Sequence, residues 1–312
     1  MILCCGEALI DFIPTPDGQA YQPCPGGSIL NIAVGLGRLE VPVGFLSRLS
    51  TDIFGDQLAD HLSLNNVKLD FCPRIKGQTT LAFVNLSDDD NAEPQYAFYA
   101  EGAVDRDMEI SDLPERMDSV DTLHFGSISL LLEPGATALE TLLLRESRKK
   151  IISLDPNVRP TLVSEHLVYQ KRFEKWAAAV DILRMSEVDF SFIYPNRDFE
   201  NMLPEWFEYG LSLAILTRGD EGAIGYLPDG TTAQARPPRI QVADTVGAGD
   251  TFLSAALAYL FDHGLIQSRK RIAQMSKTQL ADCLAYAVRA AAINCTRKGA
   301  NPPYKHEMEG AL

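Results

Sequence analysis

Basic residues are scarce in this chain. Its 312 residues include 28 Lys and Arg against 42 Asp and Glu, which gives a formal net charge of −14 at pH 7. A nucleic acid or an anionic membrane surface would need a basic footprint, so the charge balance argues against both as partners. A small polyanion is still allowed, because backbone amides at a helix N-terminus and a metal ion can hold it locally.

Long apolar runs and a secretion signal are also missing. The longest mostly apolar stretch, residues 252–261, is about half the ~20 residues that a membrane helix needs. The chain begins with MILCCGEALIDF, which has no basic segment before an apolar one and no small-residue cleavage pattern. We therefore expect a cytoplasmic protein without a membrane partner.

Metal-binding, redox and several nucleotide-binding patterns are absent as well. The 6 cysteines and 5 histidines show neither C-x-x-C nor H-E-x-x-H spacing, so we expect reduced thiols and no zinc site. No G-x-x-x-x-G-K-[ST] string occurs, which excludes a P-loop kinase. The G-L-G at 35–37 lacks the third glycine of a dinucleotide fingerprint, which argues against a dinucleotide-dependent sugar oxidoreductase.

Short apolar runs alternate with amphipathic or alanine-rich segments, which is typical of βαβ units in a mainly parallel sheet covered by helices. The pattern predicts strands at 2–5, 43–47, 122–125, 151–154, 181–185 and 213–217. It predicts helices at 28–39, 54–65, 134–149, 166–179, 251–263 and 278–296. The length suits one α/β domain over residues 1–312 with a small appendage.

Two stretches, at about 9–21 and 79–103, break this rhythm. The second contains TTLAFVNL and QYAFYAEG, which are rich in strand-forming residues and are separated by the acidic turn SDDDNAEP. We expect these insertions to form a small β-sheet lid over the carboxyl end of the main sheet, where open α/β folds place their ligands. The unpaired edges and apolar face of such a sheet favour a homodimer through the lid.

The most informative segment is RIQVADTVGAGDTF at 239–252, in which a Gly-x-Gly turn precedes an almost wholly apolar helix. The amides of Gly247, Ala248 and Gly249 at a helix N-terminus can donate to phosphoryl oxygens with the help of the helix dipole. Asp250 follows directly, where it can accept the proton of an attacking hydroxyl. The alternative is a turn in which Asp250 only caps the helix. The long string and the apolar helix after it favour phosphoryl transfer with Asp250 as the base.

The string DTVGAGDTF resembles the second signature of the ribokinase-like carbohydrate kinases, the PfkB family. The segment PGGSILNIAVGLGRL at 25–39 resembles their first signature, and the resemblance extends over essentially the whole chain. It implies a three-layer α/β/α fold with a mainly parallel sheet and a small β-sheet lid. It also implies ATP and Mg²⁺ as cofactors and transfer of the γ-phosphoryl group to a sugar hydroxyl.

The same resemblance implies a sugar site. Gly26, Gly27 and Asn31 would approach sugar hydroxyls, since glycines expose backbone and asparagine offers both a donor and an acceptor. Asp11 in GEALIDFIP would accept two neighbouring hydroxyls. Arg159 in IISLDPNVRP would lie near substrate and phosphate and offset developing negative charge. The alternatives are an ordinary tight turn, a solvated aspartate and a surface salt bridge.

For the nucleotide and metal ions, the resemblance rests on several shorter strings. RMSEVDF resembles the N-x-x-E element that organises magnesium, with Ser186 and Asp189 in place of Asn and Glu. Asp189 would act directly or through water, and Glu187 is a possible substitute. LTRGDEGA resembles a nucleotide-bordering turn, although a plain hairpin turn is the alternative. The residues implied for the nucleotide are Ser186, Thr217, Gly219, Gly247, Gly249 and Asn294. A monovalent cation, K⁺, is implied near Asp244, Val246 and Gly299.

The choice of sugar rests on softer similarity. GEALIDFIPT, HFGSISLLLEP at 124–134 and SLDPNVRP each resemble bacterial and plant fructokinases, which favours fructose. The lid segment FYAEGAVDR departs from the F-Y-R-N form of relatives, with Ala100 and Glu101 in place of Arg and Asn. One alternative is a 2-keto-3-deoxygluconate kinase, in which Arg159 supplies a cationic contact. Another is a catalytically silent sugar-binding or regulatory protein, which the altered S-E-V-D element motivates.

Overall fold

The main sheet of the computed structural model, which describes residues 1–15, 17–85 and 95–310, has nine strands in the order β15-β14-β13-β12-β11-β10-β1-β4-β6. Every pair from β6 to β13 is parallel, whereas β14 and β15 join the edge as antiparallel strands. The strands of this sheet are β1 Ile2–Cys5, β4 Val43–Leu46, β6 Val67–Phe71, β10 Thr122–Gly126, β11 Ile151–Asp155, β12 Ile182–Ser186, β13 Leu213–Thr217, β14 Ala223–Tyr226 and β15 Thr232–Ala235.

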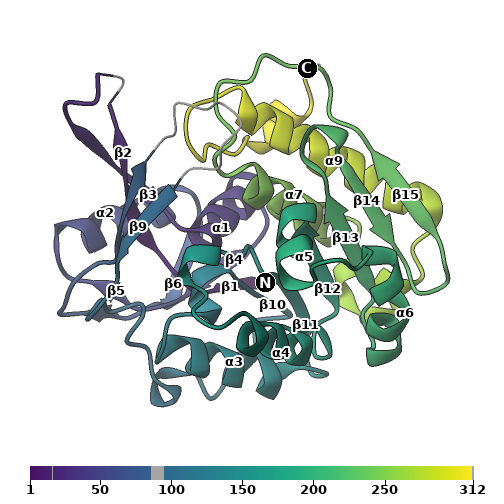
Figure 1. The fold of residues 1–312 in the computed structure, drawn as a ribbon, viewed down its shortest axis with the longest axis horizontal. Coiled ribbons are helices and arrows are strands. Elements are labelled where there is room, and N and C mark those ends of the chain that lie inside the picture. The colour runs from purple at the N-terminus through teal and green to yellow at the C-terminus, as the bar shows by residue number, and fades with distance from the viewer. Residues whose placement is uncertain (16, 86–94, 311–312) are drawn as a thin grey trace.

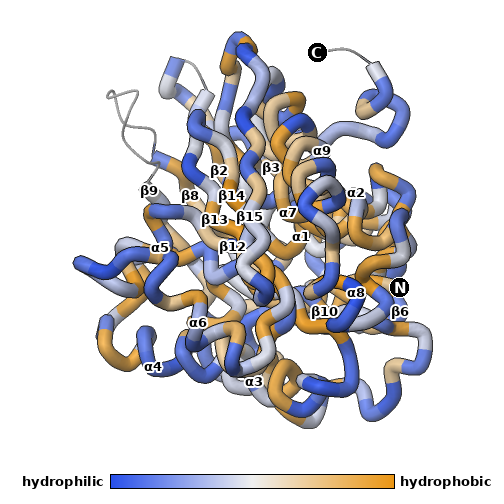
Figure 2. Tube along the Cα trace, turned by 90° about the vertical axis from the view of Figure 1, so that its right-hand side faces the viewer, coloured by the Kyte–Doolittle hydropathy of each residue, from blue (hydrophilic) through white to orange (hydrophobic). Residues whose placement is uncertain are grey.

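Helices cover both faces of this sheet (Figure 1). Successive strand residues alternate between two cores, so that Ile2 and Cys4 pack in one and Leu3 and Cys5 in the other. The first core includes residues of α1 Ser28–Arg38, α2 Ile53–Leu64, α7 Ala248–Asp262, α8 Arg269–Ala273 and α9 Lys277–Cys295. The second includes residues of α3 Gly135–Glu146, α4 His166–Ala177, α5 Glu187–Ile193 and α6 Phe199–Tyr209. The three-layer α/β/α prediction is confirmed, and Figure 2 shows the hydrophobic colour concentrated around α1, α7 and the central strands.

A second sheet stands beside the main one, at the left of Figure 1. Its order is β3-β2-β8-β9, with β2 Leu9–Pro14, β3 Tyr21–Gly26, β8 Leu81–Asn85 and β9 Gln95–Tyr99. This confirms the small sheet predicted from the two insertions, although the acidic turn 87–94 lies outside the described residues. A separate two-stranded parallel sheet is formed by β5 Leu49–Ser50 and β7 Arg74–Ile75.

The predicted strands and helices recur with shifts of a few residues at their ends, and other elements were not predicted. Helix α6 contains Pro204 and forms because it buries an apolar face that includes Trp206. Helix α5 has only 7 residues and begins with a capping box between Ser186 and Asp189. Helix α7 starts three positions before its predicted start, at Ala248. No helix of the described ranges is long and apolar enough to cross a bilayer.

Candidate active site

A cavity of about 510 Å³ lies at the carboxyl ends of the parallel strands, between the main sheet and the lid sheet. The segments after β1, β10, β11 and β12 contribute Glu7, Ser127, Asn157 and Ser186 to its wall. The lid contributes residues such as Asp11, and the beginning of α7 completes the wall. Loops that follow neighbouring parallel strands converge at one edge of a sheet, so this is the position that the fold provides for a ligand.

The beginning of α7 forms a tight turn. Gly247 is the N-cap residue with φ 72°, and a Cβ atom there would lie 2.6 Å from the Cβ atom of Ala300. The amide of Ala248 donates to the carbonyl of Thr245 at 3.1 Å. The following amides, of Gly249 and Asp250, belong to the first helical turn, whose N–H groups have no intrahelical acceptor. They can therefore serve an anion in the cavity.

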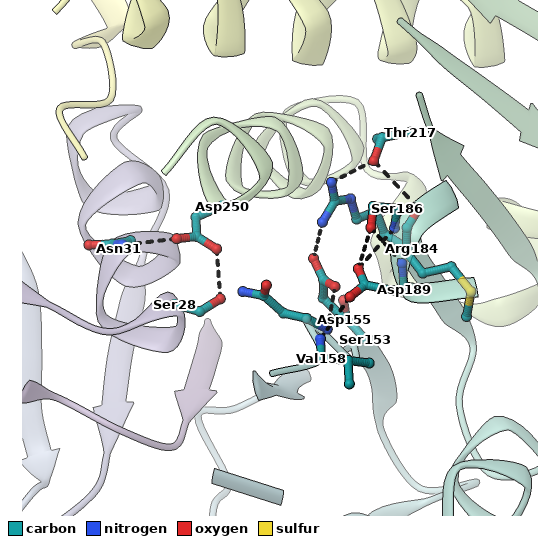
Figure 3. Close-up of polar contacts among 12 residues, drawn as sticks. Ser28, Asn31, Ser153, Asp155, Val158, Arg184, Ser186, Asp189, Thr217 and Asp250 are labelled. Carbon is teal, nitrogen blue, oxygen red and sulfur yellow. Dashed lines mark hydrogen bonds and ion pairs between the residues drawn. The ribbon is translucent and has the colours of Figure 1, made fainter. Parts of the chain in front are cut away.

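Asp250 lies inside the first turn of α7 and is not its cap, because Gly247 occupies that position. Its Oδ1 accepts a hydrogen bond from the Ser28 hydroxyl at 2.6 Å, and its Oδ2 accepts one from Asn31 Nδ2 at 2.9 Å (Figure 3). Ser28 and Asn31 are three residues apart on α1, so both face α7. The carboxylate is only 7% exposed and is oriented toward the cavity that it lines. Sequence reasoning missed Ser28, although its position after two glycines at a helix start was a usable signal.

Asp11 lies on the cavity face of the lid, above Gly26. A Cβ atom at Gly26 would lie 2.0 Å from Asp11 Oδ2, so only glycine leaves this carboxylate in place. The pKa of Asp11 is raised to about 7, mainly by burial; the charge of Arg159 opposes this rise, and the charges of Asp250 and Glu7 add to it. The structure therefore brings Asp11 and Arg159 to the same end of the cavity.

Arg159 is held in place by its own loop. Its Nη1 donates to Asn157 Oδ1 at 2.6 Å, and its guanidinium lies 5.8 Å from the ring centroid of Tyr96 in the lid. The stem of this loop is fixed by Asp189, whose Oδ1 accepts from the Val158 amide at 2.8 Å. This arrangement directs Arg159 toward the lid.

Glu7 was not predicted and occupies the cavity wall below Gly27. Burial raises its pKa to about 7, although hydrogen bonds, the strongest from Ser129, oppose this shift. The backbone of Gly27 has φ 104°, and a Cβ atom there would lie 3.1 Å from Glu7 Cγ. Glu7 thus supports the turn that starts α1. A glutamate inside the apolar string GEALI was the signal for a buried carboxyl.

The S-E-V-D element forms the start of α5. Asp189 Oδ2 accepts from the Ser186 hydroxyl at 2.6 Å, while its Oδ1 is bonded to Val158. Both residues line the cavity. Among the described residues, no group of three His, Cys, Asp or Glu side chains could enclose a metal ion.

Of the other residues predicted for the nucleotide and a cation, Val246 lines the cavity, whereas Asn294, Asp244, Gly299, Thr217 and Gly219 are not among its lining residues. Asn294 is fully buried and bridges two loops, with Nδ2 donating to the Val246 carbonyl at 2.8 Å and Oδ1 accepting from the Asn301 amide at 2.7 Å. Asp244 accepts from the amides of Val246 at 3.0 Å and Gly299 at 2.8 Å. Thr217 accepts a hydrogen bond from a buried arginine, and Gly219 follows it in the next loop. The contacts of Asn294 and Asp244 hold the loop that leads into α7.

Replacing Asn294 with alanine is expected to destabilise the protein by about 1–3 kcal/mol, because the partly buried Val246 carbonyl and Asn301 amide each lose their partner. Urea unfolding would measure the change in the free energy of unfolding. Asn201→Ala is the matched control, since Asn201 is exposed on α6 and donates only to Asp198 at 3.2 Å. Equal stability of the two variants would contradict the bridging role of Asn294.

The chain is similar to known proteins over its whole length. A sequence model for the pfkB family carbohydrate kinases matches residues 1–307. The chain is 38% identical over 273 residues to a fructokinase of Rhizobium leguminosarum bv. trifolii, covering 86% of this chain and 82% of the relative. It is 32% identical over 328 residues to the probable fructokinase-6, chloroplastic, of Arabidopsis thaliana, covering 100% of this chain and 82% of that protein.

The fold has a counterpart among solved structures. The crystal structure of a fructokinase with bound ATP from Xylella fastidiosa has a TM-score of 0.85 to this structure at 25% sequence identity. The match covers 98% of this chain and 97% of that one. The similarity therefore includes the main sheet, its two helical layers and the lid.

Proposed function

The chain belongs to the pfkB family of carbohydrate kinases, and from this we propose that it is a fructokinase, which transfers the γ-phosphoryl group of ATP to D-fructose and forms fructose 6-phosphate. A bacterial and a plant relative carry the name fructokinase at 38% and 32% identity. The similar structure from Xylella fastidiosa contains ATP, which supports ATP as the donor.

The observation that carries this proposal is the oriented carboxylate of Asp250 at the start of α7. It faces a cavity large enough for a sugar and the end of a triphosphate. A primary hydroxyl of fructose attacks the γ-phosphorus in line as ADP leaves, Asp250 takes the hydroxyl proton, and the free amides that follow the turn of Gly247, Ala248 and Gly249 stabilise the negative charge. Asn31 and Ser28 orient Asp250 until the sugar hydroxyl reaches it.

We assign sugar binding to the lid end of the cavity. Asp11 accepts two neighbouring sugar hydroxyls, while Gly26 and Gly27 allow the sugar to approach the backbone. Arg159 donates from the opposite wall, and Asn31 adds its amide near the reacting hydroxyl. Ser186 contacts the phosphates. Thr217, Gly219 and Asn294 shape the nucleotide site through the loops that they support.

Two metal ions complete the proposal. Mg²⁺ would offset negative charge on the ATP phosphates, with Asp189 holding it through water because both Asp189 oxygens already accept hydrogen bonds. A monovalent cation, K⁺, would lie near Asp244, Val246 and Gly299, where the Asp244 carboxylate accepts hydrogen bonds from the amides of Val246 and Gly299 beside the α7 loop. Thermal unfolding in matched KCl and NaCl tests the second site, and equal melting temperatures would remove it.

The test of the function is a coupled ADP-release assay with MgATP. The panel is fructose, ribose, 2-keto-3-deoxygluconate, glucose and adenosine. We expect the highest kcat/KM with fructose. Preference for 2-keto-3-deoxygluconate would point to Arg159 binding a carboxylate and would overturn the fructose assignment. Sugar-dependent thermal stabilisation without ADP release would instead indicate a silent sugar-binding protein.

Replacing Gly26 with alanine is expected to raise the KM for fructose by roughly tenfold, because the new Cβ displaces the Asp11 carboxylate from a distance of 2.0 Å. The KM for MgATP should stay unchanged. Gly310→Ala is the matched control, since Gly310 is not left-handed and a Cβ there would lie 4.0 Å from the nearest atom, the carbonyl oxygen of Glu307. A change in both KM values with Gly26→Ala would indicate general misfolding rather than a local displacement.

We further propose a homodimer through the outer face of the lid. Phe12 and Phe83 stack there at 4.7 Å between ring centroids, beside Tyr21 and Tyr99, which are 49% and 65% exposed. Exposed aromatic side chains on a sheet with free edges favour association with a second copy. Light scattering at micromolar concentration would decide this, and a monomeric mass would contradict it.

We place the reaction in the cytoplasm. All six cysteines lie within the described residues and are free thiols, as is usual in a reducing compartment. Cell fractionation with detection of the native protein would test this placement.

A further inference from the structure

A buried arginine lies beside the phosphate end of the cavity. Arg184 is the one charged residue of β12, whose sequence is ILRMS, and it is only 6% exposed. Its Nη1 donates to Asp155 Oδ2 at 2.6 Å, and its Nη2 donates to Thr217 Oγ1 at 2.5 Å (Figure 3). Asp155 is the last residue of β11 and Thr217 is the last residue of β13, the two strands that flank β12. The guanidinium is therefore fixed by three adjacent strands.

The two partners leave part of the guanidinium unused. A guanidinium has five N–H donors, and Asp155 and Thr217 take two of them. The buried Nε has no hydrogen-bond partner among the described residues. Leaving donors of a charged group without an acceptor is costly, and Arg184 lines the cavity, so its remaining Nη hydrogens are available to an acceptor there.

The unused donors lie against the α7 turn. A Cβ atom built on Gly249 would lie 3.0 Å from both terminal nitrogens of Arg184, and Arg184 itself lines the cavity. Burial alone would lower the pKa of Arg184, but the charges of Asp155, Asp189 and Asp250 raise it above its ordinary value. The side chain is thus a permanent cation next to the amides that receive the phosphoryl group.

Arg159, which the sequence singled out near substrate and phosphate, faces the lid. Its guanidinium donates to Asn157 and lies 5.8 Å from the ring centroid of Tyr96, and its charge opposes the rise in the pKa of Asp11. The sugar end of the cavity therefore has Arg159, and the phosphate end has Arg184.

We propose that Arg184 is a catalytic residue that binds oxygens of the transferring phosphoryl group through the donors that Asp155 and Thr217 leave free. This inference rests on the proposed kinase function and deepens it. The bond from the γ-phosphorus to the ADP oxygen breaks as the bond to the sugar oxygen forms, and the sugar proton goes to Asp250. Arg184 gives and takes no proton, and it offsets the charge that spreads over the phosphoryl oxygens.

The test compares Arg184→Met and Arg184→Lys with a matched control, Arg269→Met. Arg269 forms a similar ion pair with Asp181, directly before the start of β12, away from the cavity. We expect Arg184→Met to lower kcat by roughly 10–50-fold, with Arg184→Lys recovering part of the loss. The KM for fructose should stay within about twofold. Arg269→Met should lower the melting temperature and leave the kcat of the folded fraction unchanged.

Nucleotide binding provides a readout that a purely structural role would not change. By calorimetry with Mg²⁺ and either ATP or ADP, the wild-type protein should prefer ATP, and Arg184→Lys and Arg184→Met should lose most of that preference. Unchanged kcat and unchanged ATP over ADP preference in Arg184→Lys and Arg184→Met would overturn the proposal. If Arg184→Met does not fold, the same measurements on Arg184→Lys and Thr217→Val decide the proposal. Thr217→Val removes the acceptor of one Arg184 donor and keeps the charge of Arg184. Inactivity of the wild-type protein on every sugar would refute the kinase function. The comparison of ATP and ADP affinities would still test whether Arg184 binds the phosphoryl group.

Discussion

Replacing Asp250 with asparagine is expected to lower kcat with fructose by roughly 10²–10⁴-fold, the range that a general base contributes. Asparagine keeps the shape of the side chain and can still accept the hydrogen bond from Ser28, but it cannot take the sugar proton. The dissociation constant for fructose, measured by calorimetry without ATP, should change by less than about threefold. Chemistry and binding are thereby separated in one variant.

The control for this prediction lies at the other end of the same helix. Asp262→Asn removes a carboxylate from the last turn of α7, where Asp262 forms only a partly exposed ion pair with Lys305 at 3.3 Å. Its kcat should equal that of the wild-type protein, because exposed ion pairs contribute little. Turnover of Asp250→Asn at the wild-type rate would contradict the role of Asp250 as base, and with it the kinase assignment.

The start of α7 could be predicted from sequence because its parts are consecutive. The glycines, the helix N-terminus and Asp250 are neighbours in the chain, so their roles follow from local geometry. The helix start itself was predicted three residues late, because Asp250 resembles a cap residue. The structure shows that the left-handed Gly247 takes the cap position, which moves Asp250 into the helix and toward the cavity.

Arg184 and Ser28 could not be predicted in the same way. Arg184 reads as an isolated charge in an apolar strand, and only the order β11-β12-β13 brings Asp155 and Thr217 to its two ends. Ser28 precedes Asp250 by more than two hundred residues, and their contact depends on α1 packing against α7. Both pairings are non-local, so the sequence can mark Ser28 as a residue at a helix start but does not show which residue Ser28 or Arg184 contacts.

Asn31 has a contact that the sequence did not predict. The sequence predicted that it contacts the sugar, and the structure has its amide on Asp250 at 2.9 Å. Both positions lie within one cavity, because α1 begins directly below the lid. An asparagine amide has two donor hydrogens, so one can remain on Asp250 while the other serves a sugar hydroxyl.

The second large effect is expected from Asp11→Asn, which should lower kcat/KM for fructose by roughly 10²-fold. Each hydrogen bond to an ionised acceptor contributes about 1.5–3 kcal/mol, and asparagine keeps only a weaker neutral acceptor. The KM for MgATP should not change, because Asp11 belongs to the lid end of the cavity. Asp17→Asn, in the same lid hairpin but exposed, is the matched control and should behave like the wild-type protein.

The pH dependence of this variant separates Asp11 from Glu7, since burial raises the pKa of each carboxyl group to about 7. Only ionised Asp11 accepts two sugar hydroxyls, so wild-type affinity for fructose should fall as the pH drops below about 7, by up to tenfold per pH unit. Asp11→Asn should lose this dependence, and a dependence that persists would belong to Glu7.

The stability of the folded protein should change with pH in the opposite direction. The folded protein holds the Asp11 proton more tightly than the unfolded chain does, so ionisation between about pH 4 and 7 lowers the free energy of unfolding. Without fructose, Asp11→Asn should therefore melt above the wild-type protein by a larger margin at pH 8 than at pH 5. An equal difference in melting temperature at both pH values would show that Asp11 is already ionised at pH 5.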